Sequence, residues 1–120
     1  MKIKTYTLSS CDTSKRILSE TGITKENSII RDIKSSAINP AELDEMKALS
    51  GSYESLFSRR AKKYKSLSLK DKMLSESDYR DLILKEYTFL KRPVVIIGDN
   101  IFIGNSKKNV MSLKEAINRL

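Results

Sequence analysis

The chain has 120 residues, 39% of them hydrophobic and 32% charged, which predicts one folded domain over residues 1–120 and excludes a disordered or fibrous protein. No run reaches the roughly 20 apolar residues of a transmembrane helix, and the start shows no signal-peptide core, so we expect a cytoplasmic protein without a membrane partner. One cysteine and no histidine exclude an internal disulfide and predict no metal site, while the net charge of +8 suits an anionic partner.

The first third of the chain predicts a strand, a helix and a second strand. Residues 2–8 mix β-branched and aromatic side chains with lysine, which is typical of a strand. Residues 12–21 suit a helix that ends at Gly22, and the isoleucine-rich residues 28–33 suit a second strand. Because two strands of one sheet joined by a helix run parallel, the segment indicates an α/β fold. Cys11 then follows the carboxyl end of the first strand.

The middle of the chain, about 38–90, is predicted to be a helical insertion. Residues 39–49 begin with an Asn-Pro pair typical of a helix N-terminus. A second helical stretch is expected from about Ser52, and the basic run 59–65 would be its end or the loop after it. Residues 75–90 begin with a capping-box pattern and continue with apolar residues at helical spacing, which predicts a third helix.

The last part of the chain predicts a β-hairpin and a closing helix. Residues 93–98 form a nearly continuous apolar run, expected to lie in the centre of a sheet, and residues 99–100 are expected to form the hairpin turn. The return strand is 101–104, and residues 106–120 repeat apolar side chains every three to four positions. The order β-α-β, helical insertion, β-hairpin, helix is that of a thioredoxin-like fold.

The position of Cys11 suggests chemistry, although a lone cysteine is more often a small buried side chain. It lies between a strand and a helix, where free backbone N–H groups and the helix dipole favour a thiolate. Neighbouring hydroxyl groups make the site polar, and the same N–H groups suit an oxyanion. The candidate substrate-binding residues beside the thiol are Ser10, Asp12, Thr13 and Ser14.

Two separated motifs resemble the arsenate reductase (ArsC) family, and the resemblance covers essentially the whole chain. The segment YTLSSCDTSKRIL is similar to the family's first strand, nucleophilic cysteine and helix. The segment LKRPVV resembles its Arg-Pro element, and IGNSKKNV resembles the stretch that leads into its last helix. The resemblance implies that a cysteine attacks arsenate, that three arginines hold the oxyanion, and that glutathione and glutaredoxin supply the reducing thiols.

The family's functional residues fall on four positions of this chain. By motif, Cys11 is the nucleophile, Arg92 of the Arg-Pro element binds the anion, and Arg60 in FSRRAKKYKSL is a second anion-binding arginine. Asn105 occupies the position of the third arginine. This departure removes one charged hydrogen bond to the anion, worth about 1.5–3 kcal/mol.

The Cys-Asp-Thr sequence resembles an ArsC-like subgroup whose members look like glutathione-dependent thiol reductases. We therefore expect an oxidoreductase without a bound cofactor, which takes a small oxyanion or thiol substrate and is recycled by glutathione or glutaredoxin. The alternative is a regulatory protein similar to the Spx type, which would bind RNA polymerase without turnover. Ser14 stands where the second cysteine of an Spx-type Cys-x-x-Cys switch would be, so no internal disulfide switch is expected. Nucleic acid is the less expected partner.

Overall fold

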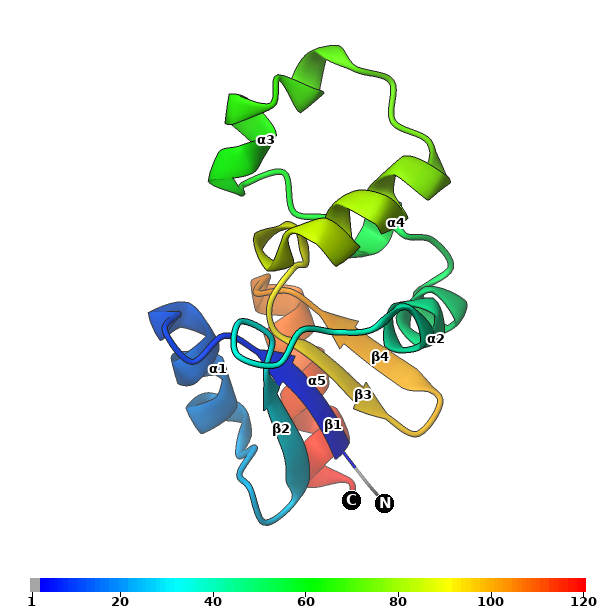
Figure 1. Cartoon of the computed structure of the whole chain (residues 1–120). Coiled ribbons are helices and arrows are strands. Elements are labelled where there is room, and N and C mark those ends of the chain that lie inside the picture. Colours follow the sequence, from blue (N-terminus) through cyan, green and yellow to red (C-terminus); the bar gives the residue numbers. More distant parts are fainter. Residues whose placement is uncertain (1–2) are drawn as a thin grey trace. The chain divides into compact units, whose positions relative to one another are not determined.

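A computed structural model describes residues 3–120 of the chain (Figure 1). The residues form two compact units: the first joins the chain up to Ser36 with Arg92–Leu120, and the second is Ala37–Lys91. The second unit has nearly the bounds expected for the helical insertion. The organisation of the chain as a single domain stays a prediction.

The first unit contains a four-stranded sheet and two helices. Their order in the chain is β1 (Ile3–Thr7), α1 (Asp12–Thr21), β2 (Ser28–Asp32), β3 (Val94–Ile97), β4 (Asn100–Ile103) and α5 (Lys107–Asn118). The sheet order is β2-β1-β3-β4, with β2 parallel to β1 and β3 antiparallel to both β1 and β4. The predicted βαβ unit and hairpin are therefore confirmed. Lys2, which the first predicted strand included, lies outside the described residues.

The hairpin turn lies one residue earlier than predicted. Ile97 pairs with Asn100, so the two turn residues are Gly98 and Asp99, and β4 ends at Ile103. Gly98 has a φ of 60°, a value that a residue without a Cβ adopts most readily at the first position of a tight hairpin turn. The expected turn at 99–100 is therefore wrong.

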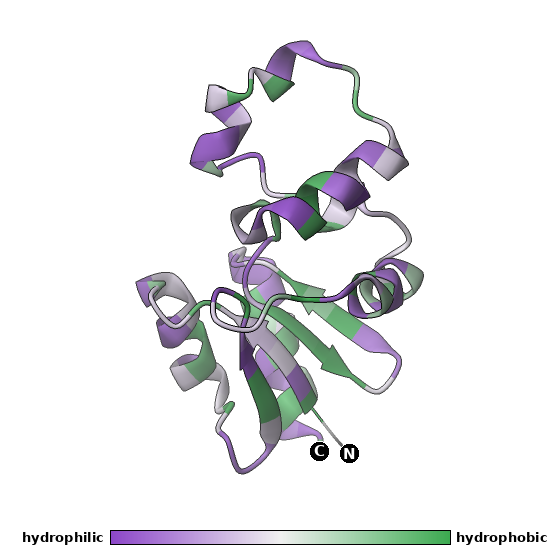
Figure 2. Cartoon of the chain, in the orientation of Figure 1, coloured by the Kyte–Doolittle hydropathy of each residue, from purple (hydrophilic) through white to green (hydrophobic). Residues whose placement is uncertain are grey.

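The core of the first unit lies between the sheet and the helices α1 and α5, which contact one another. Its buried members are Ile3, Ile17, Ile23, Val95, Ile97 and Leu113. All four residues of β3 are buried, which confirms the central position predicted for this run. Figure 2 shows β3 in the green of hydrophobic residues. Burial of this apolar surface holds α1, and with it Cys11 at its start, against the end of the sheet.

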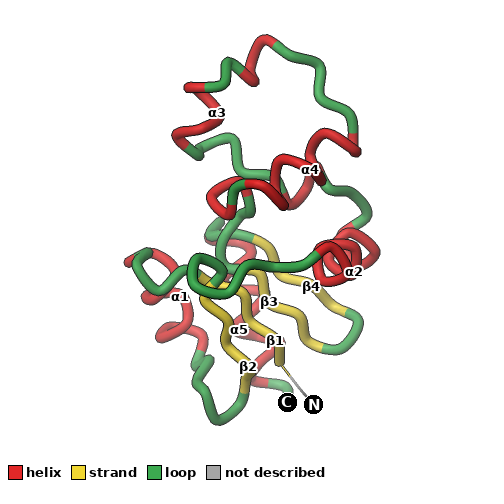
Figure 3. Tube along the Cα trace, viewed as in Figure 1, coloured by secondary structure: helices red, strands yellow, loops and turns green. Residues whose placement is uncertain are grey.

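The second unit is made of short helices. Their order is α2 (Pro40–Ser50), η1 (Glu54–Leu56), α3 (Lys62–Ser66), η2 (Leu69–Asp71), α4 (Glu76–Lys85) and η3 (Tyr87–Phe89). Complete capping boxes begin α2, where Asn39 pairs with Glu42, and α4, where Ser75 pairs with Asp78. Both helix starts are therefore confirmed. Figure 3 shows that loops join most of these helices.

The helical stretch expected from about Ser52 is wrong, since only the single 3-10 turn η1 forms there. The hydroxyl of Ser52 accepts a hydrogen bond from the backbone N–H of Ser55 at 3.1 Å, and the hydroxyl of Ser55 donates to the carbonyl of Ser52 at 2.7 Å. Such local bonds offer the backbone an alternative to a helix. The last four residues of the basic run, 62–65, instead belong to the separate helix α3 (Lys62–Ser66).

The helix expected at 75–90 is too long, because α4 ends at Lys85. Glu86 is extended, with φ −140° and ψ 109°, and η3 follows it. The residues of η3 are aromatic or β-branched and lose side-chain freedom in a helix. The hydroxyl of Thr88 also donates to the carboxylate of Glu86 at 3.1 Å, which favours the local turn.

Phe57 is the centre of an aromatic core in the second unit. Its ring stacks on Phe89 with a centroid distance of 4.9 Å, and it lies 4.9 Å from the Tyr79 ring and 6.1 Å from the Tyr64 ring. Phe57, Tyr79 and Phe89 are buried and so form part of the core of the second unit. The backbones of Phe57 and Leu90 also form a β-bridge.

Candidate functional site

Cys11 closes a tight turn between β1 and α1. Its backbone N–H donates to the carbonyl of Leu8 at 3.0 Å, and its own carbonyl accepts from the N–H of Lys15 at 3.1 Å. Cys11 is therefore the residue that caps α1, with φ −95° and ψ 112°. Its thiol makes no side-chain capping hydrogen bond and is half-buried. The loop that carries it joins β1 to α1 in Figure 3.

The surroundings of Cys11 lower the pKa of its thiol. Partial burial is the largest single influence on this pKa and raises it, but four other influences outweigh burial. The hydroxyl of Ser14, the backbone N–H groups of Ser14 and Thr13, and the positive charge of Arg92 all favour the ionised sulfur. Arg92, which is far from Cys11 in the sequence, thus lowers the pKa of the thiol through its charge.

Three buried polar atoms of the first unit lack a partner. Within residues 3–120, the buried side-chain nitrogen and oxygen atoms without a hydrogen bond are Thr7 Oγ1, Ser14 Oγ and Arg92 NH1. Ser14 and Arg92 both influence the thiol, as described above. Thr7 ends β1, one position beyond the Tyr6–Val94 pair, and so lies beside the start of β3. Buried donors are normally satisfied, so the partnerless atoms of Ser14 and Arg92, the two residues that also influence the thiol, indicate a place for a polar ligand beside Cys11.

Arg92 precedes a cis peptide bond to Pro93, the isomer that its Arg-Pro sequence makes plausible. The carbonyl of Pro93 accepts from the N–H of Gly104 at 2.9 Å. The side-chain amide of Asn109 donates to the carbonyl of Gly104 at 2.9 Å. These bonds fix the segment that contains Asn105 next to the start of β3. The side chain of Asn105 itself is exposed.

The residues next to Cys11 that were predicted to bind substrate differ in how exposed their side chains are. Ser14 is buried and Thr13 is half-buried, whereas Ser10 and Asp12 are exposed. Burial alone does not test whether these residues contact a substrate. The roles of Ser10, Asp12, Thr13 and Ser14 in substrate binding stay predictions.

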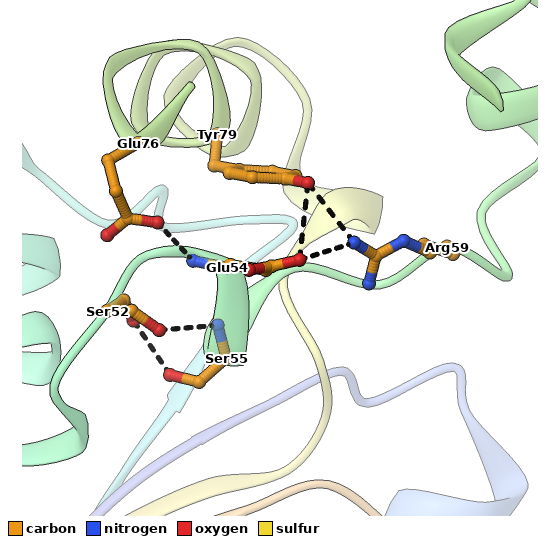
Figure 4. A network of polar contacts seen from close by, with 6 residues as sticks. All are labelled: Ser52, Glu54, Ser55, Arg59, Glu76 and Tyr79. Carbon is orange, nitrogen blue, oxygen red and sulfur yellow. Dashed lines mark hydrogen bonds and ion pairs between the residues drawn. The ribbon is translucent and has the colours of Figure 1, made fainter. Parts of the chain in front are cut away.

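Arg60 and its neighbour Arg59 have different surroundings in the second unit. The guanidinium of Arg59 donates to the Glu54 carboxylate at 2.8 Å and to the Tyr79 hydroxyl at 3.1 Å (Figure 4). The Glu54 carboxylate raises the pKa of Arg59. Figure 4 also shows Glu76 accepting from the backbone N–H of Glu54, a bond of 3.1 Å. Arg59 is thus tied to its own unit, while Arg60 is exposed, and the predicted role of Arg60 stays a prediction.

Sequence reasoning missed Thr7 and a contact between Ser9 and Asp32. The hydroxyl of Ser9 donates to the Asp32 carboxylate at 2.7 Å, and this bond is the largest cause of the lowered pKa of Asp32. Thr7 and Asp32 are paired residues of the parallel strands β1 and β2. The predicted parallel pairing of the first two strands could have indicated this contact, because the carboxyl ends of parallel strands lie at the same edge of a sheet.

The described part of the chain contains neither a candidate metal centre nor a candidate membrane span. No three His, Cys, Asp or Glu side chains of residues 3–120 lie together in a way that could hold a metal ion. No helix of these residues has both the length and the apolar character that crossing a bilayer requires.

Comparison with known proteins agrees with the fold and the resemblance. The model of the ArsC family matches residues 6–113. An arsenate reductase from Vibrio cholerae superposes with a TM-score of 0.76 at 19% identity, covering 94% of this chain and 98% of that chain. An arsenate reductase (ArsC) related protein from Brucella melitensis gives 0.67 at 22% identity, covering 93% of each chain.

A protein from Staphylococcus aureus gives a TM-score of 0.69 at 26% identity, covering 92% of this chain and 96% of that chain. No curated protein matches the sequence significantly. The fold is thioredoxin-like, as predicted.

Proposed function

The chain belongs to the ArsC family, and from this we propose that it is a thiol reductase in which Cys11 attacks a small oxyanion, with arsenate as the first substrate to test. The observation that carries the proposal is the convergence on one thiol of a lowered pKa and buried donors without partners. Ser14 and Arg92 contribute to both. A thiolate beside unpaired donors suits attack on an anion better than passive packing does.

The proposed reaction consumes two glutathione thiols for each arsenate and regenerates the Cys11 thiol. The Cys11 thiolate attacks arsenic and displaces one oxygen as water, which forms a sulfur–arsenic bond. A glutathione thiol then attacks the Cys11 sulfur, so that the two sulfurs are oxidised to a mixed disulfide while arsenate is reduced to arsenite. A second glutathione, free or through glutaredoxin, releases Cys11. An external thiol is required because the chain has one cysteine. A cytoplasmic location, where glutathione is abundant, is part of the proposal.

The side chains around the thiol have separate roles in this proposal. The charge of Arg92 and the hydroxyl of Ser14 favour the attacking thiolate, and the unpaired NH1 of Arg92 is available to an oxygen of the anion. The N–H groups at the start of α1 stabilise negative charge that develops on the substrate.

We expect Cys11 to react as a thiolate at a lower pH than an ordinary cysteine. The rate of alkylation by iodoacetamide, followed from pH 5 to 10, should give a pKa below that of the same thiol in the urea-unfolded chain, because Ser14 and Arg92 act only in the folded state. The unfolded chain is the matched control. Equal pKa values in the two states would contradict the proposed site.

Replacing Arg92 by alanine should reduce kcat/KM for arsenate by about 10- to 100-fold, because one charged hydrogen bond to an anion is worth about 1.5–3 kcal/mol. The assay couples arsenate reduction to glutathione and glutaredoxin. Arg92→Lys should give an intermediate value, since lysine keeps the charge but not the fork of donors. The control is Lys114→Ala, which removes an exposed charge of α5. If Arg92→Ala matched this control, Arg92 would have no part in binding the anion.

Replacing Asn105 by arginine should raise kcat/KM for arsenate about tenfold or more, because it restores the third cation of the family motif. Asn105 is exposed, so the substitution should change stability by less than about 0.5 kcal/mol. Asn118→Arg adds the same charge at an exposed position of α5 and serves as the control. An arsenate rate that is the same in both variants would mean that the physiological substrate is a different oxyanion or an oxidised thiol.

A second candidate function is binding to RNA polymerase through the basic run 59–65. Within residues 3–120, the exposed side chains of Arg60, Lys62, Lys63 and Lys65 form no ion pair, which favours an acidic partner. Binding that persists in Cys11→Ser and weakens with salt would support this function. Turnover that depends on Cys11 would support the reductase.

A further inference from the structure

The turn that presents Cys11 is held from the neighbouring strand by one carboxylate. Asp32 ends β2 and pairs with Thr7, the last residue of β1. Its carboxylate accepts from the hydroxyl of Ser9 at 2.7 Å and, with longer geometry, from the backbone N–H of Ser9 at 3.5 Å. Ser9 is the second residue of the turn that the Cys11 N–H closes on Leu8.

Asp32 is itself fixed by the loop that follows it. Its carboxylate accepts from the backbone N–H of Lys34 at 3.2 Å, and its carbonyl accepts from the N–H of Ser36 at 2.9 Å. The N–H of Ile33 donates to the carbonyl of Thr7 at 2.9 Å, which continues the β1–β2 pairing past Asp32. The carboxylate therefore has little freedom to move, and it holds Ser9 against a rigid strand end.

We propose that Asp32 is the positioning residue of the nucleophile, because its carboxylate fixes the Leu8–Cys11 turn and so holds the sulfur against the start of α1. This proposal rests on the proposed function only in taking Cys11 as the reacting group. Asp32 does not touch the thiol and is not among the groups that shift its pKa directly. It acts through Ser9, and it affects the thiol by fixing the position of the turn that carries it.

The sign of the effect separates this role from simple electrostatics. Removing a negative charge near a thiol would favour the thiolate and lower the pKa of Cys11. Loosening the turn would instead weaken the pKa-lowering influence of Ser14 and Thr13 on the sulfur and raise that pKa. We expect Asp32→Ala to slow iodoacetamide alkylation at pH 7 by about three- to tenfold, the size expected for one lost hydrogen bond to a charged group or slightly less.

The experiment compares alkylation rates from pH 5 to 10 in the unaltered chain and in five variants, which include Asp32→Ala and its double variant with Ser9→Ala. Asp32→Asn keeps one acceptor oxygen for Ser9 and should fall between wild type and Asp32→Ala. Ser9→Ala removes the donor, should resemble Asp32→Ala, and should add little in the double variant, because both disrupt one contact. Asp81→Ala, which removes an exposed carboxylate of α4, is the control for the change in net charge and should leave the profile unchanged.

A thiol pKa that falls, or stays at the wild-type value, in both Asp32→Ala and Ser9→Ala would overturn the proposal, as would effects that add fully in the double variant. If Asp32→Ala does not fold, Ser9→Ala decides alone, because it alters an exposed side chain and leaves the carboxylate in place. Alkylation requires no turnover, so the positioning role can be confirmed even if arsenate is not reduced. Conversely, turnover with an unperturbed pKa in the variants would support the reductase and reject the positioning role.

Discussion

The Cys11→Ser variant should lose essentially all arsenate reduction, with a fall in turnover of at least about a thousandfold, as is usual when a covalent nucleophile is removed. Serine keeps the size and the turn, but its hydroxyl does not ionise at neutral pH. The pKa-lowering contacts of Ser14 and Arg92 cannot compensate for the far weaker acidity of the oxygen. The measurement is the coupled assay at saturating glutathione and glutaredoxin.

Two controls make the Cys11→Ser result interpretable. Thermal unfolding should be within a few degrees of wild type, because the residue is half-buried and makes no side-chain capping bond. Intact mass after incubation with oxidised glutathione should show one adduct on wild type and none on the variant, since the chain has one cysteine. Residual turnover close to wild type in a folded, unmodified variant would reject Cys11 as the nucleophile.

Replacing Phe57 by alanine should lower the free energy of unfolding by about 3–5 kcal/mol, because it deletes a fully buried aromatic ring and leaves a cavity. Phe57 is 0% exposed and contacts three other rings, so few neighbours can move to fill the space. The loss is a large part of the 5–15 kcal/mol that stabilises a typical domain. Urea unfolding followed by far-ultraviolet circular dichroism measures it.

The matched control for Phe57→Ala is Phe102→Ala in β4. Phe102 is only partly buried against the core of the first unit, so its removal should cost clearly less. Equal costs for the two substitutions would contradict the central place of Phe57 among the aromatic rings. If the substitution changed the slope of the unfolding free energy against urea concentration, rather than the midpoint, it would have changed the surface exposed on unfolding.

Much of the fold is predictable because its elements begin and end with residues of specific chemistry. Gly22 has a φ of 79° at the end of α1, and the Asn39 and Ser75 capping boxes begin α2 and α4. The apolar run of β3 is long enough for an inner strand. The two errors in helix bounds fall where short-range polar bonds decide the backbone, between Ser52 and Ser55 and between Glu86 and Thr88, because hydrophobic periodicity does not detect such bonds.

The candidate site is predictable in a different way. Cys11 and Arg92 stand out in the sequence because each belongs to a motif, and the structure shows that Arg92 influences the thiol. Thr7 and Asp32 belong to no motif. Their positions near the site depend on the register of β1 with β2 and β3. The register depends on how two segments pair, so it cannot be predicted from the residues of one segment alone.

The first turn of α1 begins at a residue whose thiol does not cap it. Because folding lowers the pKa of Cys11, ionising the sulfur stabilises the folded chain. This stabilisation is present above the pKa of the unfolded thiol and is lost as the pH falls through the pKa of the folded one. A mixed disulfide removes the negative charge from the Cys11 sulfur. Melting temperature measured above the pKa of the unfolded thiol, about 8.5, should therefore report the oxidation state of Cys11, which offers a label-free way to screen small anions and disulfides against this protein.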